Sequence, residues 1–267
     1  MRSKIRRLSP RTLVITGASR GIGAALATSY AEVGRSLLLI ARDAQKLDAV
    51  AATCRARGAE VETAMVDVRD PAAMMDCIRR FDDRHPVDLV IANAGVSSSI
   101  GADGSPEPPA LAQTTFDVNL GGAINSISPL IEPMCQRGGG QIAVICSLAA
   151  LYPFPNTPSY SASKVALATW ARAVGLAHSD DGIRVTVIYP GFVETDMSAR
   201  VIGPRPMIEE ATKAAARIRR ALRRGRNTIA FPFRLRLYIA CLRMVPYDLA
   251  KFCLKPSAYT VRRKDQP

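Results

Sequence analysis

Residues 12–23 read TLVITGASRGIG, and this stretch decides the fold. Its first five residues are apolar or β-branched and predict a short buried strand, while apolar residues at helical spacing follow the glycines. Glycines between a strand and a helix let the backbone approach a pyrophosphate, and the helix N-terminus offers it unpaired N–H groups. The stretch therefore predicts a dinucleotide-binding turn. Its expected cofactor contacts are Gly17, Ser19, Arg20, Gly21, Ile22 and Gly23.

Beyond this turn, short apolar runs alternate with helical patterns along the chain. Near-continuous apolar strands are typical of a parallel sheet that is covered by helices on both faces. Repeated strand–helix units with right-handed crossovers build such a sheet. We therefore expect an α/β fold: a single Rossmann-like domain with a doubly wound, seven-stranded parallel sheet. The expected strands are 12–16, 36–41, 61–66, 88–92, 141–146, 184–189 and, more weakly, 227–231.

The predicted helices carry recognisable start signals. Asp43 and Asp70 are candidate N-caps, and Pro71 suits the first helical position. Pro129 and Pro133 are expected to bend or break the helix in which they lie. The predicted helices are 22–33, 44–57, 71–84, 111–137 and 159–178.

The charge of the chain is unevenly distributed. The net charge is +13, and residues 1–199 contribute none of it, because their basic and acidic residues balance. The whole excess lies in residues 200–267. Such a basic segment attracts lipid headgroups, nucleic acid or an acidic protein, or it is simply a solvated face. Nucleic acid is not an expected partner, because no recognition motif and few interleaved aromatic residues accompany the charge.

The spacing of the cysteines and histidines along the chain does not match a metal-binding pattern. The six cysteines form no CxxC pair, and His85 and His178 are the chain's two histidines. We therefore expect no metal centre and reduced thiols. The sequence shows neither a signal-peptide apolar region nor a run long enough to span a bilayer, so a cytoplasmic location is expected.

Tyr160 and Lys164 stand four residues apart in a predicted helix, which places both side chains on one face. A free phenol has a pKa of about 10, and an ammonium group nearby favours the phenolate and lowers that pKa. We expect Tyr160 to donate a proton to a substrate oxygen, or to accept one in the reverse direction. Ser147 follows the end of a predicted strand, where ligands bind in open α/β sheets. A Ser-His-Asp hydrolase is not expected, because neither His85 nor His178 sits in a plausible place for the triad.

Residues 11–200 resemble the short-chain dehydrogenase/reductase family, whose signature TGxxxGxG matches the glycine turn. Further family markers appear in the family's order along the chain. These are Asp67-Val68, Asn93-Ala94-Gly95, Asn119, Ser147, Tyr160 with Lys164, Pro190-Gly191, Val193 and Thr195.

The resemblance implies a role for each of these residues. Ser147 would hold the substrate oxygen, Lys164 would bind the nicotinamide ribose, and Asn119 would serve a water-mediated proton relay to Lys164. The other markers would contact the cofactor, with Asp67 beside the adenine. The implied chemistry is hydride transfer between the cofactor and a carbonyl or carbinol carbon. Family members are commonly dimers or tetramers, so a homodimer or tetramer is expected.

Arginines mark the expected ribose site. In NAD-binding sheets an acid near the end of the second strand bonds the ribose 2′-hydroxyl, whereas an arginine accommodates a 2′-phosphate. That strand ends here in Ala41-Arg42, and Arg20 adds a second cation from the glycine turn. We therefore predict a preference for NADP(H), with NAD(H) as the second candidate.

Two segments lie outside these motifs. The resemblance makes residues 192–215 a substrate lid within a catalytic domain spanning 11–226. Its apolar side chains favour a hydrophobic or lipid-like ketone; they are Phe192, Met197, Val201, Ile202 and Met207. Residues 227–267 form a basic, apolar extension.

In that extension Leu235, Ile239 and Leu242 share one helical face. Three interpretations of the extension are open. The first is that it packs on the domain or on a second subunit, and the second is that residues 217–255 lie on an anionic membrane. The third is that it binds an acidic partner such as an acyl carrier protein.

The predicted function is thus an NADP(H)-dependent carbonyl reductase or alcohol dehydrogenase with Tyr160 as its acid/base. Two alternatives stay open: a catalytically silent NADP-binding regulator, and a reductase of acyl-carrier-bound 3-keto substrates. The intact set of Ser147, Tyr160, Lys164 and Asn119 favours an enzyme over the silent regulator.

Overall fold

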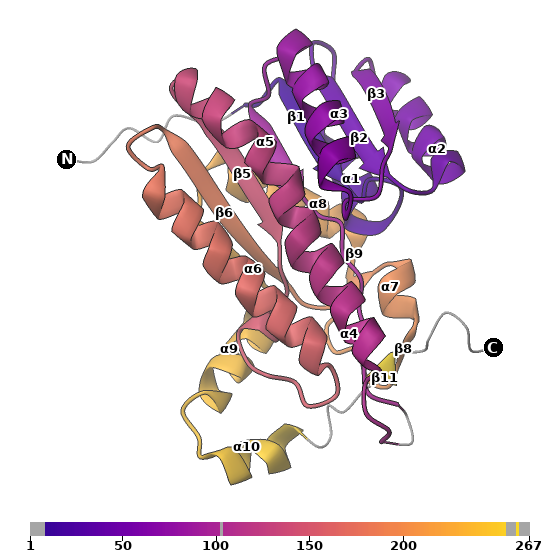
Figure 1. The fold of residues 1–267 in the computed structure, drawn as a ribbon. Helices are drawn as coiled ribbons and strands as arrows, with labels where there is room; N and C mark the ends of the chain where they lie inside the picture. The colour runs from indigo at the N-terminus through magenta and orange to yellow at the C-terminus, as the bar shows by residue number, and fades with distance from the viewer. Residues whose placement is uncertain (1–8, 102–103, 255–259, 262–267) are drawn as a thin grey trace.

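The computed structural model describes residues 9–101, 104–254 and 260–261, and its centre is a parallel sheet (Figure 1). Seven strands lie in the order β10-β6-β5-β4-β1-β2-β3, all parallel. The order reverses between β1 and β4, which makes that crevice the topological switch point. The predicted fold class is confirmed. The strands are β1 Thr12–Thr16, β2 Ser36–Ala41, β3 Glu60–Met65, β4 Leu89–Ala92, β5 Gly140–Ile145, β6 Ile183–Pro190 and β10 Thr228–Phe231.

Helices cover both faces of the sheet (Figure 1). On one face lie α3 Pro71–Arg84, α4 Pro109–Phe116, α5 Gly122–Gln136 and α6 Pro158–Ala177. On the other lie α1 Gly21–Tyr30, α2 Ala44–Arg55 and α8 Ala211–Arg223. Asp43 and Asp70 cap α2 and α3 as predicted, accepting hydrogen bonds from the backbone N–H groups of Lys46 and Ala73.

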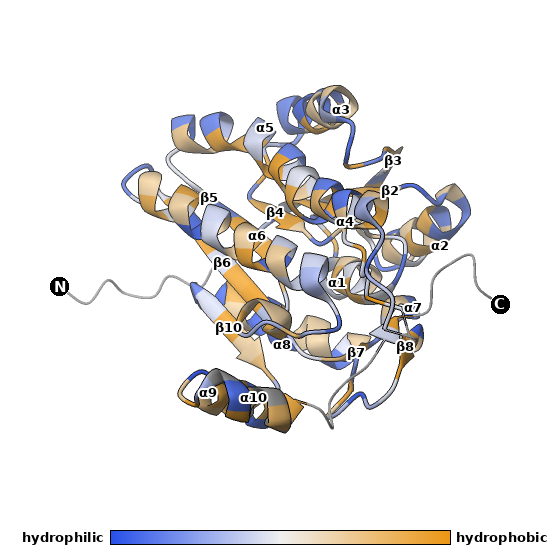
Figure 2. Ribbon diagram, turned by 60° about the horizontal axis from the view of Figure 1, so that its bottom comes forward, coloured by the Kyte–Doolittle hydropathy of each residue, from blue (hydrophilic) through white to orange (hydrophobic). Residues whose placement is uncertain are grey.

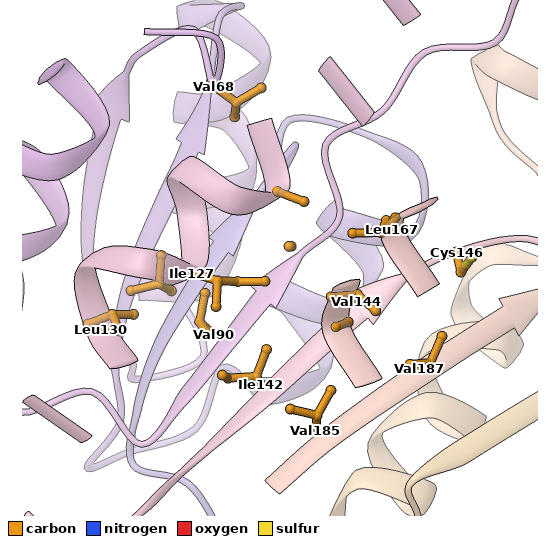
Figure 3. Packing of buried hydrophobic residues seen from close by; sticks show 14 of the residues in the cluster. Val68, Val90, Ile127, Leu130, Ile142, Val144, Cys146, Leu167, Val185 and Val187 are labelled. Carbon is orange, nitrogen blue, oxygen red and sulfur yellow. The ribbon is translucent and has the colours of Figure 1, made fainter. Parts of the chain in front are cut away.

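The apolar runs that predicted the strands form the core. Figure 3 shows Val90, Ile142 and Val144 of the strands beside Ile127 and Leu130 of α5, and all of these side chains are buried. Burial of each such side chain stabilises the fold by about 1.5–3 kcal/mol. This core holds the strand ends rigidly, and those ends carry the site residues.

The predicted helix over residues 111–137 is wrong in one respect. The chain forms α4, then a π-helical turn η1, Asp117–Gly121, and then α5, which runs through both Pro129 and Pro133. The interruption therefore lies at η1 and not at the prolines. A tertiary contact explains its place, because the buried Asn119 side chain in η1 bonds the backbone of Val96. Such π-turns are frequent at functional sites.

Short elements follow β6 and form the region expected as a lid. They are β7 Val193–Glu194, α7 Asp196–Ala199, β8 Val201–Ile202 and β9 Glu209–Glu210. Strand β7 pairs with β9, and β8 pairs with β11, Thr260–Val261, near the end of the chain. The C-terminal segment therefore reaches back and hydrogen-bonds this region.

The remaining elements are α9, Phe233–Leu242, and α10, Tyr247–Leu254. The first residues of the expected extension form β10, which pairs with β6 at the edge of the sheet. Ile239 and Leu242 do share a face, and that face is buried against the protein. Residues 255–259 and 262–267 of the expected extension lie outside the described residues. Within the described part of the chain, no helix is long and apolar enough to cross a membrane.

Candidate active site

The glycine turn joins β1 to α1 at the switch point. Gly17 and Gly21 adopt φ angles of +64° and +57°, which favour glycine. A Cβ on Gly23 would lie 2.2 Å from the Gly17 carbonyl oxygen, so the helix sits directly against the turn. The α1 N-terminus has no side-chain cap and no acid in its first turn. These free N–H groups, beside backbone that admits no side chain, fit a pyrophosphate.

Asn93 fastens this turn to the neighbouring strand. Its Nδ2 donates to the carbonyl oxygens of Thr16, at 3.0 Å, and Gly17, at 3.1 Å. The Thr16 hydroxyl accepts in return from the backbone N–H groups of Asn93 and Ala94. Asn93 therefore shapes the cradle from behind, and Ala94 lies so near that a Cβ on Gly17 would meet its Cα at 2.8 Å.

Cations gather at the expected ribose end of the cradle. Arg42 Nη1 lies 3.5 Å from Asp67 Oδ2, and Arg20 Nη1 lies 3.2 Å from Asp196 Oδ2. Both arginine side chains are about half exposed, so these ion pairs are weak and can be exchanged for a phosphate. Asp67 is held mainly by Arg69, whose Nε and Nη2 donate to the two carboxylate oxygens and lower the pKa of that carboxyl to about 2.

The sequence-based prediction missed two cations and one acid in this cluster. Lys46 Nζ lies 3.9 Å from Asp196, the same carboxylate that Arg20 contacts. Burial, and next the charge of Arg20, lower the pKa of Arg200. Arg200 and Asp196 come from α7 and its end, more than 170 residues after the glycine turn, and local spacing could not have shown this proximity.

Lys164 is buried in α6, and its Nζ donates to the carbonyl oxygen of Ile145 at 2.9 Å. Burial lowers the pKa of this ammonium. The Nζ lies 5.9 Å from the centre of the Tyr160 ring, so the predicted pair shares one face at the carboxyl end of β5. A Cβ on Gly95, after β4, would lie 3.4 Å from the same Nζ. The pair therefore borders the crevice beside the switch point.

Asn119 is fully buried in the π-turn. Its Oδ1 accepts from the Val96 N–H at 2.8 Å, and its Nδ2 donates to the Val96 carbonyl and to Ser163 Oγ, each at 3.0 Å. These bonds use both amide hydrogens and join the loop after β4 to α6. Ser163 precedes Lys164, so Asn119 is bonded to the turn of α6 that carries the lysine.

Ser147 is the N-cap of η2, a 3-10 turn at Leu148–Ala150, and its Oγ accepts from the Ala149 N–H at 3.1 Å. The residue comes two positions after Ile145, whose carbonyl binds Lys164. Ser147 and Lys164 are thus held at the end of the same strand.

Glu107 was not predicted from the sequence. Its Oε2 accepts from the Ser159 backbone N–H and hydroxyl in the first turn of α6, immediately before Tyr160. An acid at a helix N-terminus is favourable, because the free N–H groups and the helix dipole are positive there. Glu107 thereby fixes the start of the helix that carries the tyrosine.

The segment after β6 closes the other side of the crevice. The Gly191 N–H donates to the Phe231 carbonyl at 2.7 Å, and a Cβ on Gly191 would lie 2.9 Å from Pro232. Val193 is buried, and Thr195 caps α7 through a reciprocal bond pair with Ser198. Gly21 meets Thr195, because a Cβ on that glycine would lie 2.8 Å from the threonine methyl.

Other predicted cofactor residues border the same edge. Ser19 and Ile22 are half-buried in the turn and the first turn of α1. Val68 is buried, and its carbonyl accepts from Asn125 of α5. Pro190 ends β6 beside β10. The predicted residues therefore lie along the carboxyl ends of the strands on both sides of the switch point, as expected for a nucleotide site.

The fold and this edge define a Rossmann-type, nucleotide-binding oxidoreductase. The chain belongs to the short-chain dehydrogenase family, because residues 11–204 match the family described as short chain dehydrogenase. Members of this family act between CH–OH and C=O groups with NAD(P)(H). The enzyme class predicted from the sequence is confirmed.

Similar proteins agree with this assignment. An uncharacterised oxidoreductase of Myxococcus xanthus is 31% identical over 243 residues, which cover 91% of this chain and 95% of the relative. Gluconate 5-dehydrogenase of Gluconobacter oxydans is 28% identical over 73% of this chain and 76% of its own. The structure of Gluconobacter frateurii L-sorbose reductase with NADPH and L-sorbose shares the fold, with a TM-score of 0.73 at 23% identity, covering 85% of this chain and 97% of that one.

Proposed function

We propose that the protein is an NADP(H)-dependent reductase of a hydrophobic carbonyl compound, with Tyr160 as its proton donor. The observation that carries this proposal is the Tyr160–Lys164 pair, held at the carboxyl end of β5 by the Lys164 bond to Ile145. The nicotinamide cofactor supplies the hydride when bound. The proton comes from the chain's own residues.

The proposed mechanism gives each side chain one task. Ser147 Oγ and the Tyr160 hydroxyl hold the substrate oxygen, and Tyr160 transfers its proton as that oxygen gains charge. Lys164 stabilises the phenolate that results, because an ammonium favours a neighbouring anion. Asn119 and Glu107 position α6, the former through Ser163 and the latter through Ser159.

The preference for NADP(H) is supported by the charges around the ribose end. Arg20, Arg42, Lys46 and Arg200 surround that end with positive charge, and their partners Asp67 and Asp196 face partly into solvent. A 2′-phosphate would add two negative charges to this cluster.

Steady-state kinetics with both cofactors tests the whole proposal. NADPH oxidation is measured with ketones of increasing chain length, and kcat/KM is expected to rise with chain length and to favour NADPH over NADH at least tenfold. The double substitution of Arg20 and Arg42 by alanine should abolish that preference, while Arg57→Ala, in the turn after α2 and away from the cluster, should keep it. A wild-type preference for NADH would contradict the cofactor assignment.

The hydrophobic substrate is supported by the side chains of the proposed lid. Phe192 and Met197 are half-buried, whereas Ile202 and Met207 are about half exposed. Strand β11 pins this region, since Val261 pairs with Val201 and its N–H donates to Ser99 at 2.8 Å. An apolar ligand would cover these side chains and gain their burial energy.

We also propose that α9 and α10 rest on an anionic membrane. Phe233 and Leu237 are 69% and 52% exposed and share the face of α9 opposite its buried residues, and Met244, two residues after the helix, is 87% exposed. Figure 2 shows α9 and α10 together at the edge beyond β10. Exposed arginines accompany this stripe, namely Arg234, Arg236 and Arg243. An apolar stripe beside arginines is typical of helices that lie at a membrane surface.

Flotation with vesicles that contain anionic lipid tests this surface. Leu237→Asp should lose binding, while Val33→Asp, an exposed apolar residue between α1 and β2, should keep it. Wild-type protein that stays with the unbound fraction would contradict membrane contact. Light scattering on the same samples tests the expected homodimer or tetramer.

A further inference from the structure

Three side chains that the sequence did not connect meet at the end of the sheet opposite the active site. Cys135 lies in the last turn of α5, His178 is the C-cap of α6, and Asp181 lies in the turn that leads to β6. Cys135 Sγ is 3.7 Å from His178 Nδ1 and 3.7 Å from Asp181 Oδ2, and the latter two atoms are 3.1 Å apart. A thiol, an imidazole and a carboxylate therefore face one another.

These separations suit one metal ion. Sides of 3.7, 3.7 and 3.1 Å define a triangle whose circumscribed circle has a radius of about 2.0 Å. A point slightly off its plane thus lies about 2.0–2.3 Å from all three atoms, which are the lengths of Zn–N, Zn–O and Zn–S bonds. A zinc ion would fit without rearrangement of the ligands. Partial exposure of the cluster leaves room for water as a fourth ligand.

The local electrostatics favour a cation. Helices α5 and α6 both end at this cluster, and a helix C-terminus carries partial negative charge from its unpaired carbonyl groups. Burial first and the Asp181 carboxylate next raise the pKa of the Cys135 thiol. Zinc would bind Cys135 as the thiolate, and the thiol proton would go to solvent.

We propose that Cys135, His178 and Asp181 form a zinc site that ties the end of α5 to the turn between α6 and β6. The mixture of one thiolate, one imidazole and one carboxylate suits Zn²⁺ in tetrahedral coordination. Tyr160 lies eighteen residues earlier on α6, about 27 Å along the helix. The site therefore stabilises the fold and leaves hydride transfer unchanged.

Titration with Co²⁺, which reports on thiolate ligands through its absorption, tests the site in the reduced, chelator-treated full-length chain. One equivalent should give a thiolate–cobalt charge-transfer band together with the intense visible bands of tetrahedral cobalt. Cys135→Ser and His178→Ala should abolish the charge-transfer band. Cys241→Ser removes an exposed cysteine on α9 and should leave the band unchanged. Circular dichroism confirms that each variant is folded.

Zinc provides a second readout. At a hundredfold excess over Kd, Zn²⁺ should raise the melting temperature of the wild type by about 5 °C and that of Cys135→Ser by less than about 1 °C. Turnover with NADPH should be the same with and without zinc, so this test stands apart from that of the proposed activity. The absence of a cobalt band, or a band that survives Cys135→Ser, would overturn the site and leave a hydrogen-bonded cluster only.

Discussion

Replacing Gly23 by alanine probes the cofactor cradle directly. The new Cβ would lie 2.2 Å from the Gly17 oxygen and 2.5 Å from Asn93 Nδ2, whereas real Cβ contacts stay above 3.0 Å. The start of α1 must therefore move by roughly 1 Å relative to the turn. That shift strains the Asn93 bonds to Thr16 and Gly17 and turns the helix N–H groups away from a pyrophosphate.

The size of the effect follows from these contacts. Loss of one or two charge-assisted hydrogen bonds costs about 3 kcal/mol, which raises the Kd for NADPH at least about a hundredfold. Overpacking should also lower the free energy of unfolding by about 1–3 kcal/mol. Isothermal titration calorimetry measures the first quantity and urea denaturation the second.

Gly34→Ala is the matched control for this experiment. Gly34 has a φ of +78° and open space around it, at the other end of the sheet. Alanine there costs about 1 kcal/mol of backbone strain, and NADPH affinity should stay unchanged. If Gly23→Ala bound NADPH within twofold of the wild type, the proposed cradle would be refuted.

Two further predictions concern stability. Asp82 is buried and accepts two 2.8 Å hydrogen bonds from Arg137, so Asp82→Ala should lower the free energy of unfolding by about 3 kcal/mol and the melting temperature by about 8 °C. Asp76 forms an exposed ion pair, and Asp76→Ala should lower the free energy of unfolding by less than about 1 kcal/mol. Equal losses of stability in the two variants would contradict this prediction. Arg69→Ala should lower the free energy of unfolding by about 1 kcal/mol, because the lowered pKa of Asp67 depends on Arg69. Because this pKa is lowered in the folded state, the difference from wild type should be complete above pH 4 and shrink as pH falls toward 2, and a difference independent of pH in urea denaturation would argue against it.

Local sequence patterns predicted most of the strands and helices. The bounds of β1, β2 and α3 agree with the prediction because their apolar runs and caps are local signals. The π-turn at Asn119 was missed, since it follows from a bond to Val96, 23 residues earlier. The expected break at Pro129 and Pro133 does not occur, because burial of α5 against the sheet stabilises the helix through both residues.

The residues of the candidate site were likewise predicted only in part. Motif spacing identified the residues that line the strand ends, including Lys164 and Asn119. It could not find Arg200 beside Arg20, or Cys135 beside His178, because these pairs form only when distant elements meet. Their side chains carry no local spacing signal, and the packing of whole helices decides where they lie.

Pre-steady-state kinetics of Tyr160→Phe tests the central claim most directly. The substitution removes one hydroxyl and keeps the ring beside Lys164, so the Kd for NADPH should stay within about twofold while the rate of hydride transfer to a good ketone falls about a thousandfold. Tyr238→Phe, on α9, should transfer hydride at the wild-type rate. A Tyr160→Phe enzyme that turned over as fast as the wild type would contradict the assigned proton donor.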